Sequence, residues 1–356
     1  MKAEMTSQER VRTAIARKVP DRVPVQDGPW GATVERWHTE GLPPGKSPAE
    51  YFNYEIVAIG ADLSPRYPVK VLSEDDEFIT ETTSMGGIRK NHRDHSTTPE
   101  VIDSPIKKKD DWLRIRERLK PDFKRVDWAS ALQTYNKARE EGKYIVFGAA
   151  SGYDLLQIYV KSEQLLIMMA EDPDFVKEMV DVTSDLILDT VMQMHKEGFH
   201  FDGIWVYNDM GYRNSSLFSP GMYQQIIAPS DRKRNDRVHE KGMQTILHSC
   251  GCVKGLIPSL IDAGFDCLQP LEVKAGMDLH ELKPLYGNRI ALFGGISVLL
   301  MENPDDSKIE AEIREKFKVA MPGGGYLYHS DHSIPKDISF RKYKFVMECV
   351  RKYGQY

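Results

Sequence analysis

The sequence predicts an α/β fold of the TIM (β/α)8 barrel type. Short apolar runs alternate with longer helix-like segments, which is the pattern of a parallel sheet wrapped by helices. Runs such as YIVFG at 144–148 are apolar at nearly every position, as parallel strands buried on both faces require. Eight such runs in 356 residues match one barrel. The alternative is an open doubly wound sheet, but no G-x-G-x-x-G follows a strand.

The predicted strands and helices follow one another in regular order along the chain. Strands are expected over 22–25, 61–64, 144–148, 203–207, 245–250, 267–271, 290–294 and 325–328. Helices are expected near 109–118, 127–141, 152–171, 173–198, 220–241, 253–263 and 338–353. We expect residues 1–356 to form a single domain.

One segment, near 69–92, breaks this alternation. Two short strand-like runs, at 69–72 and 78–82, flank the acidic turn 74–77, and a Gly-Gly pair follows at 86–87. Because strand-like runs separated by a short polar turn are typical of hairpins, we predict an antiparallel hairpin insertion in the barrel.

Composition excludes several classes of protein. The net charge of −5 gives no basic field, so nucleic acid is not an expected partner. No run approaches the roughly 20 apolar residues that cross a membrane. Four cysteines are too few for a disulfide scaffold, which predicts thiols or metal ligands in a reducing, cytoplasmic compartment. The sequence leaves the oligomeric state open, a homodimer included.

The most informative motif is the His-x-Cys at the end of the run 245–250. In a strand, residues i and i+2 point the same way, so His248 and Cys250 can aim an imidazole and a thiolate at one point. Zn²⁺ takes such nitrogen and sulfur ligands in a tetrahedron. The alternative, that both side chains merely pack in the core, stays open on this motif alone.

Two later residues extend the candidate ligand set. Glu272 ends the run 267–272, and His332 follows the run 326–331, so both fall at predicted strand ends beside His248 and Cys250. Catalytic zinc sites usually hold three protein ligands and one open position. We therefore expect one of the four to be displaced by substrate or not to bind.

Aromatic and acidic side chains cluster near the same predicted strand ends. Asp209 could accept a proton or orient a ligand, or equally cap the following helix. Asp331 is expected to hold the His332 imidazole, and the other histidines, including His329 and His95, are expected at the surface. Tyr207 completes the predicted catalytic group. An aromatic substrate pocket is predicted from Trp30, Tyr153, Trp205, Tyr212 and Tyr328, with ordinary core packing as the alternative for each.

Three segments resemble the uroporphyrinogen decarboxylase superfamily. They are His-Ser-Cys-Gly at 248–251, GFDCLQPLE at 264–272 and His-Ser-Ile-Pro at 332–335. The resemblance covers most of the predicted barrel and is strongest from about residue 200 onward. It implies either a cofactor-free decarboxylase or a zinc-dependent methyltransferase that serves a corrinoid protein. Cobalamin-independent methionine synthase is a more distant likeness, and it places a glutamate ligand where Glu272 lies.

The motifs separate these two branches. Decarboxylases of this superfamily carry an Arg-Gln-Ala-Gly-Arg-Tyr element that grips carboxylates, whereas 26–33 here reads QDGPWGAT without an arginine pair. Decarboxylases also lack His-x-Cys on this strand. The methyltransferases have it, usually with a cysteine on the last strand, where this chain has His332 in closer likeness to the decarboxylases.

The resemblance therefore favours a zinc-dependent methyltransferase that takes the methyl group of a small methoxylated aromatic and passes it to a corrinoid protein. A partner must carry the corrinoid (cobalamin), because the chain has no Asp-x-His-x-x-Gly element of its own. The alternatives are a decarboxylase of a porphyrinogen-like polycarboxylate and a non-catalytic ligand-binding barrel.

Overall fold

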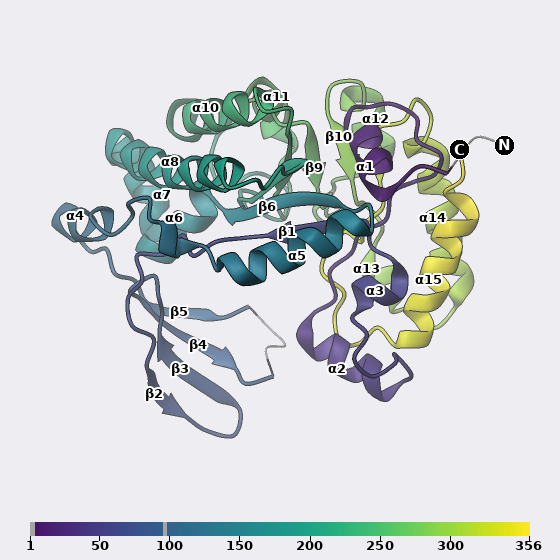
Figure 1. Ribbon diagram of the computed structural model, residues 1–356, viewed down its shortest axis with the longest axis horizontal. Helices are drawn as coiled ribbons and strands as arrows, with labels where there is room; N and C mark the ends of the chain where they lie inside the picture. Colours follow the sequence, from purple (N-terminus) through teal and green to yellow (C-terminus); the bar gives the residue numbers. More distant parts are fainter. Residues whose placement is uncertain (1–3, 95–97) are drawn as a thin grey trace.

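A curled sheet of seven parallel strands forms the barrel of the computed structural model, which describes residues 4–94 and 98–356 (Figure 1). His95 lies outside these ranges. The sheet order is β1-β6-β7-β8-β9-β10-β11, so each strand pairs with its neighbours in sequence. The strands are β1 Ile56–Ile59, β6 Tyr144–Ala150, β7 Gly203–Tyr207, β8 Gln244–His248, β9 Cys267–Gln269, β10 Ala291–Phe293 and β11 Tyr326–Leu327.

Helices follow most strands and cover the outside of the sheet, which confirms the predicted TIM-type α/β architecture (Figure 1). The predicted helix over 152–171 is divided at Lys161 into two, and the one over 220–241 contains a wide turn at 223–227. The helices are α1 Ser7–Ile15, α2 Gly31–Thr39, α3 Pro48–Phe52, α4 Lys109–Arg116, α5 Trp128–Glu140, α6 Gly152–Val160, α7 Ser162–Glu171, α8 Pro173–Lys196, α9 Pro220–Met222, α10 Ala228–His239, α11 Ile257–Asp262, α12 Leu279–Tyr286, α13 Val298–Met301, α14 Asp306–Ala320 and α15 Phe340–Tyr353. None of the described helices is both long and apolar enough to cross a membrane.

The predicted strand over 61–64 is wrong. The strand at this place in the barrel is β1, five residues earlier, and the chain turns immediately after it. Both the backbone N–H and the hydroxyl of Ser64 donate to Asp62 Oδ1, at 3.0 and 2.6 Å. Such local side-chain bonds compete with the strand ladder, which is why these residues form a turn.

The predicted strand over 22–25 is replaced by an irregular segment that lies between β11 and β1. Tyr328 N–H donates to Pro24 O at 2.9 Å on one side, and Glu55 N–H donates to Val25 O at 3.0 Å on the other. Val25 also pairs in parallel with Tyr328 as an isolated bridge. Proline has no N–H and cannot complete a ladder, so the segment closes the barrel without becoming a regular strand.

A buried carboxylate secures this closure. Glu55 is fully buried and accepts a hydrogen bond from Val25 N–H at 2.7 Å and one from Arg22 Nη1 at 2.9 Å. It also accepts a hydrogen bond from Arg10 of α1, which is itself 1% exposed. Apolar residues of α1 such as Ile15 pack against the inner face of the strands, so the helix covers one end of the barrel.

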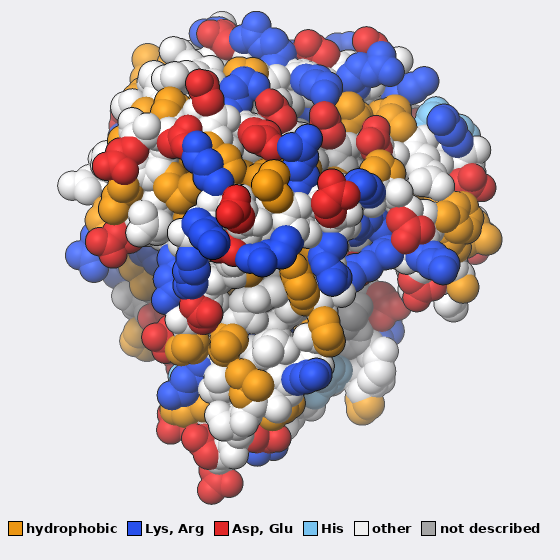
Figure 2. Space-filling view, turned by 90° about the vertical axis from the view of Figure 1, so that its left-hand side faces the viewer, with side chains coloured by type: hydrophobic (Ala, Val, Ile, Leu, Met, Phe, Trp, Pro, Cys, Tyr) orange, Lys and Arg blue, Asp and Glu red, His pale blue; other side chains and the backbone are white. Residues whose placement is uncertain are grey.

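The insertion is a four-stranded antiparallel sheet and is larger than the predicted hairpin. Its strands are β2 Val71–Glu74, β3 Phe78–Thr82, β4 Ile88–His92 and β5 Glu100–Asp103, in that order. It leaves the barrel after the carboxyl end of β1 and projects beside α6 (Figure 1). Acidic side chains gather at its tip, where the chain turns at 74–77 (Figure 2).

We predict that Glu55→Ala lowers the free energy of unfolding by about 3–5 kcal/mol, because it leaves the buried Arg10 guanidinium without one of its carboxylate partners. Glu315→Ala is the control, since Glu315 is half exposed on α14 and pairs with Lys318 at the surface. Its effect should stay within about 1 kcal/mol. Urea denaturation of both variants measures the difference, and equal effects would show that Glu55 does not secure the closure.

Candidate active site

Three neighbouring strands of the barrel present one row of polar side chains at their carboxyl ends. Tyr207 of β7 is in register with His248 of β8, which is in register with Gln269 of β9. Residues in register on neighbouring strands point to the same face, so this row projects into the barrel. Trp205 lies two residues before Tyr207, stacks on it at 5.7 Å between ring centroids and belongs to the apolar interior below.

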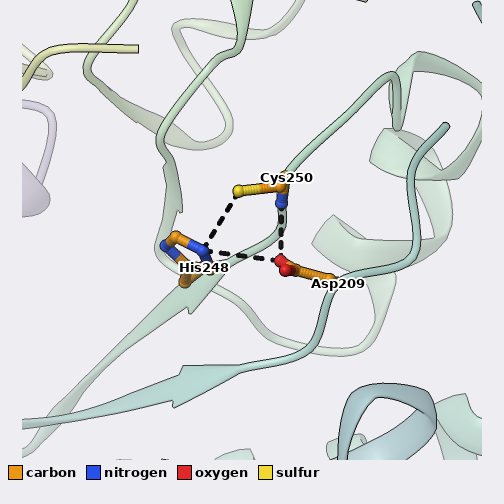
Figure 3. Close-up of side chains that lie close together, drawn as sticks. All are labelled: Asp209, His248 and Cys250. Carbon is orange, nitrogen blue, oxygen red and sulfur yellow. Dashed lines mark hydrogen bonds and ion pairs between the residues drawn. The ribbon is translucent and has the colours of Figure 1, made fainter. Parts of the chain in front are cut away.

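His248 is oriented with one nitrogen free. Its Nδ1 lies 2.5 Å from Gln269 Oε1, and because an amide oxygen only accepts hydrogen bonds, the proton is on Nδ1. Burial lowers the pKa of His248, which favours the neutral imidazole. The lone pair of Nε2 then faces Cys250 Sγ and Asp209 Oδ1, each 3.4 Å away (Figure 3).

Two loops in close contact bring Asp209 to this place. The loop after β7 and the loop after β8 touch through Gly211 and Gly251, where a Cβ on Gly211 would lie 2.4 Å from Cys250 O. Gly251 has φ +75°, a conformation that glycine adopts without strain. The contact lets Asp209 Oδ1 accept a hydrogen bond from Cys250 N–H at 2.7 Å.

The resulting donor set is compatible with Zn²⁺. Ligand atoms of Asp209, His248 and Cys250 all lie within 4.8 Å of one another. Among the described residues, these three form a cluster of the kind that could hold a metal ion. Tetrahedral zinc with ordinary bond lengths separates its ligand atoms by roughly 3.3–3.6 Å, close to the 3.4 Å seen here. Burial, followed by the charge of Asp209, raises the pKa of the Cys250 thiol, so a bound cation would be needed to stabilise the thiolate.

The other two predicted ligands lie beside this group. Glu272 is buried, accepts a hydrogen bond from Gly251 N–H at 2.5 Å and pairs with Lys274 Nζ at 3.0 Å. His332 stacks on Trp30 at 6.5 Å between ring centroids and lines the same cavity as His248. The carboxylate nearest to His248 and Cys250 is therefore that of Asp209, which the sequence predicted as an acid–base group.

A cavity of about 380 Å³ opens above this row. Trp30, Trp205 and Tyr207 supply aromatic walls, and the segment that closes the barrel supplies Gln26 and Asp27. Its charged or ionisable lining comprises Asp27, Asp209, His248, Cys250, His329 and His332. No Lys or Arg occurs among the described residues that line it.

Three of the aromatic side chains predicted for the pocket lie elsewhere. Tyr153 is buried, and its hydroxyl lies 2.5 Å from Ser162 Oγ. Tyr328 is buried within the barrel wall, with its hydroxyl 3.3 Å from Asp27 Oδ2. Tyr212 is 59% exposed at the surface. Core packing, the alternative weighed for each residue, accounts for the first two.

Asp331 has a supporting position in the loop after β11. Its carboxylate accepts hydrogen bonds from Val273 N–H at 3.0 Å and Val298 N–H at 2.8 Å. These bonds join the loops that follow three neighbouring strands, β9, β10 and β11. Burial raises the pKa of Asp331. The expected role of holding the His332 imidazole stays a prediction.

Sequence reasoning missed several residues of the cavity. His329 was expected at the surface, but it is 7% exposed and lines the cavity, so that expectation is wrong. Gln269 orients His248. The sequence could have indicated this residue, because it ends the next strand after the one that carries His248. Asp27 was not missed, since its place after the expected strand over 22–25 makes it a weaker candidate of the same kind as Asp209. It lines the cavity and accepts hydrogen bonds from Ser330 Oγ at 2.5 Å and Tyr343 Oη at 2.8 Å.

Asp154 is a further, half-buried acid near the site. It lies in the first turn of α6, and Gln157 Nε2 donates to its carboxylate at 2.6 Å. Burial, reinforced by the charge of Asp209, raises the pKa of Asp154 to about 6.

Comparison with known proteins places the chain in a family. The model of uroporphyrinogen decarboxylase (URO-D) matches residues 82–353. The chain belongs to the URO-D family. Two curated relatives, each named methylcobamide:CoM methyltransferase MtaA, come from Methanosarcina barkeri and its strain Fusaro / DSM 804. Each is 26% identical over 335 residues, which span 90% of this chain and 91% of the relative.

A solved structure supports the fold. A methyltransferase from Methanosarcina mazei aligns with a TM-score of 0.70 at 19% identity, covering 98% of this chain and 99% of that one. At this identity the likeness establishes the common barrel and its size. This URO-D protein therefore shares the whole architecture of that methyltransferase.

We predict that Asp209→Ala and Cys250→Ser each weaken zinc binding by more than about 100-fold, whereas Glu272→Ala weakens it by only about 10–100-fold. Loss of a group that only supports a ligand typically costs 10–100-fold. Titration with a zinc-chelating dye measures these affinities. Cys252→Ser is the matched control, because Cys252 is buried in the apolar core and should leave zinc binding unchanged. Zinc loss in Glu272→Ala and retention in Asp209→Ala would make Glu272 the third ligand.

We predict that Asp154→Asn stabilises the metal-free protein at pH 7.5 by on the order of 1–3 kcal/mol. Folding raises the pKa of the Asp154 carboxyl from 3.8 to about 6. At a pH well above 6 the carboxyl is ionised in both the folded and the unfolded protein, and its charge then destabilises the folded state. The gain should shrink as the pH falls from 6 to 4, because the native carboxyl then takes up a proton. Urea denaturation at pH 7.5, 6 and 4 measures it, and a gain that is constant with pH contradicts the assigned ionisation.

Proposed function

We propose that this URO-D protein is a zinc-dependent methyltransferase that takes a methyl group from a small methoxylated aromatic and passes it to a corrinoid carried by a partner protein. The observation that carries the proposal is the group of Asp209, His248 and Cys250 in a cavity with aromatic walls. The relatives named as methylcobamide:CoM methyltransferases support methyl transfer that involves a corrinoid.

The charge of the cavity supports a neutral donor. A porphyrinogen-like substrate brings several carboxylates, which in proteins are usually met by Arg or Lys. The described lining offers none, and it already holds the carboxyl groups of Asp27 and Asp209. A single aromatic ether adds no charge, and its ring matches the walls formed by Trp30 and Trp205. The cavity volume of about 380 Å³ suits one ring with small substituents.

Different residues of the cavity would hold the metal and donate the proton during ether cleavage. Zn²⁺ held by His248, Cys250 and Asp209 would supply a Lewis acid for the ether oxygen. The bond between the methyl carbon and the oxygen breaks, the carbon bonds to the Co(I) of the acceptor, and the electron pair left on oxygen takes up a proton. His329 and His332 line the same cavity, and we assign one of them as the donor of that proton.

Transfer between a corrinoid and a thiol is the second candidate. The observation in its favour is the alignment of the curated methylcobamide:CoM methyltransferases along 90% of this chain. A metal bound at His248 and Cys250 would favour the thiolate form of such a substrate. The two candidates share the site and differ in the small molecule and in the direction of methyl transfer, since the corrinoid accepts the methyl group in the first and donates it in the second.

We predict that the zinc-loaded protein methylates free Co(I) cobalamin in the presence of methoxybenzene derivatives, which is measured as a change in the cobalt absorption spectrum. Cys250→Ser should abolish this reaction, because it removes the sulfur ligand. Tyr212→Phe is the control, since Tyr212 is exposed, lies outside the cavity lining and should keep its activity. If methylcobalamin instead loses its methyl group to a thiol, the second candidate holds. Release of CO₂ from a porphyrinogen without metal would overturn both.

A further inference from the structure

A second cavity, of about 560 Å³, lies between the insertion sheet and the barrel. Its walls come from Met85, Ile88 and Val101 of the insertion and from Ile158 of α6. Figure 1 shows β5 near α6, and both follow the carboxyl ends of barrel strands, since the insertion comes after β1 and α6 comes after β6. Thr98 lines both this cavity and the cavity of about 380 Å³ beside Asp209, His248 and Cys250, so the two are neighbours. We call the former the insertion cavity and the latter the metal cavity, after its candidate ligands.

Four charged residues line the insertion cavity, and partners neutralise two of them. Arg89 pairs with Glu81 at 2.7 Å, and Asp103 pairs with Lys107 at 2.5 Å. The remaining two are Asp154, whose carboxyl is hydrogen-bonded to Gln157, and Lys161.

Lys161 is the unbalanced charge. Its Nζ donates to Ile102 O at 2.8 Å and makes no ion pair with any described residue. The carboxylate of Asp103 is near enough to feel its charge, but Lys107 already holds that group. The carboxyl of Asp154 is hydrogen-bonded to Gln157 and, among the described residues, forms no ion pair with Lys161. The cavity thus combines an apolar wall with one available ammonium group.

The backbone of Lys161 is strained, and this strained conformation sets the direction in which the side chain leaves the chain. Its φ of +71° and ψ of 145° belong to a region that residues with side chains rarely adopt. Hydrogen bonds hold it there, because Lys161 N–H donates to Gln157 O at 2.8 Å and Leu165 N–H donates to Lys161 O at 2.9 Å. Glycine adopts such a conformation with less strain, so this position carries a lysine at a cost to the backbone.

We propose that the insertion cavity is a second ligand site, separate from the metal cavity, and that it binds a small aromatic or alicyclic carboxylate. The ring packs between Met85, Ile88 and Ile158, and the carboxylate pairs with Lys161. A carboxylate fits better than a phosphate, because one lysine balances one charge and Asp103 would repel a dianion. The assignment does not depend on the metal or on methyl transfer.

Benzoate and its neutral analogue benzamide test the site by isothermal titration of the metal-free, full-length protein. Lys161→Met should weaken benzoate binding at least about tenfold and leave benzamide binding unchanged, because it keeps the aliphatic stem and removes only the charge. Lys161→Arg should restore benzoate binding. Lys318→Met is the control, since Lys318 is exposed on α14 and should behave as the wild type.

A second variant tests the apolar wall. Ile158→Trp should fill the cavity and abolish binding of both probes, whereas Ile167→Trp, at a 41% exposed position on α7, should not. If Ile158→Trp fails to fold, the comparison of Lys161→Met with the wild type decides alone. Benzoate binding that is equal in Lys161→Met and the wild type, or absent from the wild type at tens of millimolar, overturns the proposal. Because no metal is present, either result leaves the proposed methyl transfer untouched.

Discussion

The metal cavity depends on how the barrel closes between β11 and β1. Pro24 cannot donate a hydrogen bond at this seam, so backbone pairing alone leaves it incomplete. Two buried carboxylates complete it. Glu55, directly before β1, accepts a hydrogen bond from Val25 N–H, and Asp27, on the closing segment, accepts one from Ser330 Oγ in the loop after β11. The same segment also supplies Gln26 and Asp27 to the cavity that His248 lines, so the hydrogen bonds of this closure hold one of its walls in place.

The metal group is assembled from two neighbouring strands and one loop contact. His248 ends β8 and Cys250 lies two residues further on, in the loop that follows the strand. Asp209 joins them because Gly211 and Gly251 let two loops touch through their backbones. Gln269 on the next strand fixes the imidazole tautomer. Each of these contacts joins residues that are about 20–40 positions apart in the sequence. Buried supporting bonds of this kind hold ligands in place before a metal arrives.

The two cavities at the mouth differ in charge, and the difference bears on which ligands each can hold. The metal cavity has aromatic walls and acidic groups, without Lys or Arg among its described lining residues. The insertion cavity has aliphatic walls and a lysine that forms no ion pair with the residues the structure describes. This difference is the basis on which we propose a neutral ring for the first cavity and an anionic ring for the second. Thr98 separates the two, so the insertion adds binding surface to the barrel without altering the metal group.

The sequence by itself determined the features that depend on local periodicity. The apolar runs at 144–148 and 203–207 became β6 and β7, and the family motif placed His248 and Cys250 together at a strand end. Local patterns suffice there, because burial on both faces and the two-residue period act within one strand.

Only the tertiary structure decided which side chains meet across strands and loops. The strand expected at 61–64 gave way to β1, Asp209 took the place beside Cys250, and Tyr153 and Tyr328 packed into the core. His329 lies in the cavity although no motif marks it. These outcomes depend on strand register, loop-to-loop packing and the closure at Pro24. Such contacts join distant parts of the chain, so no window of sequence contains the information that fixes them.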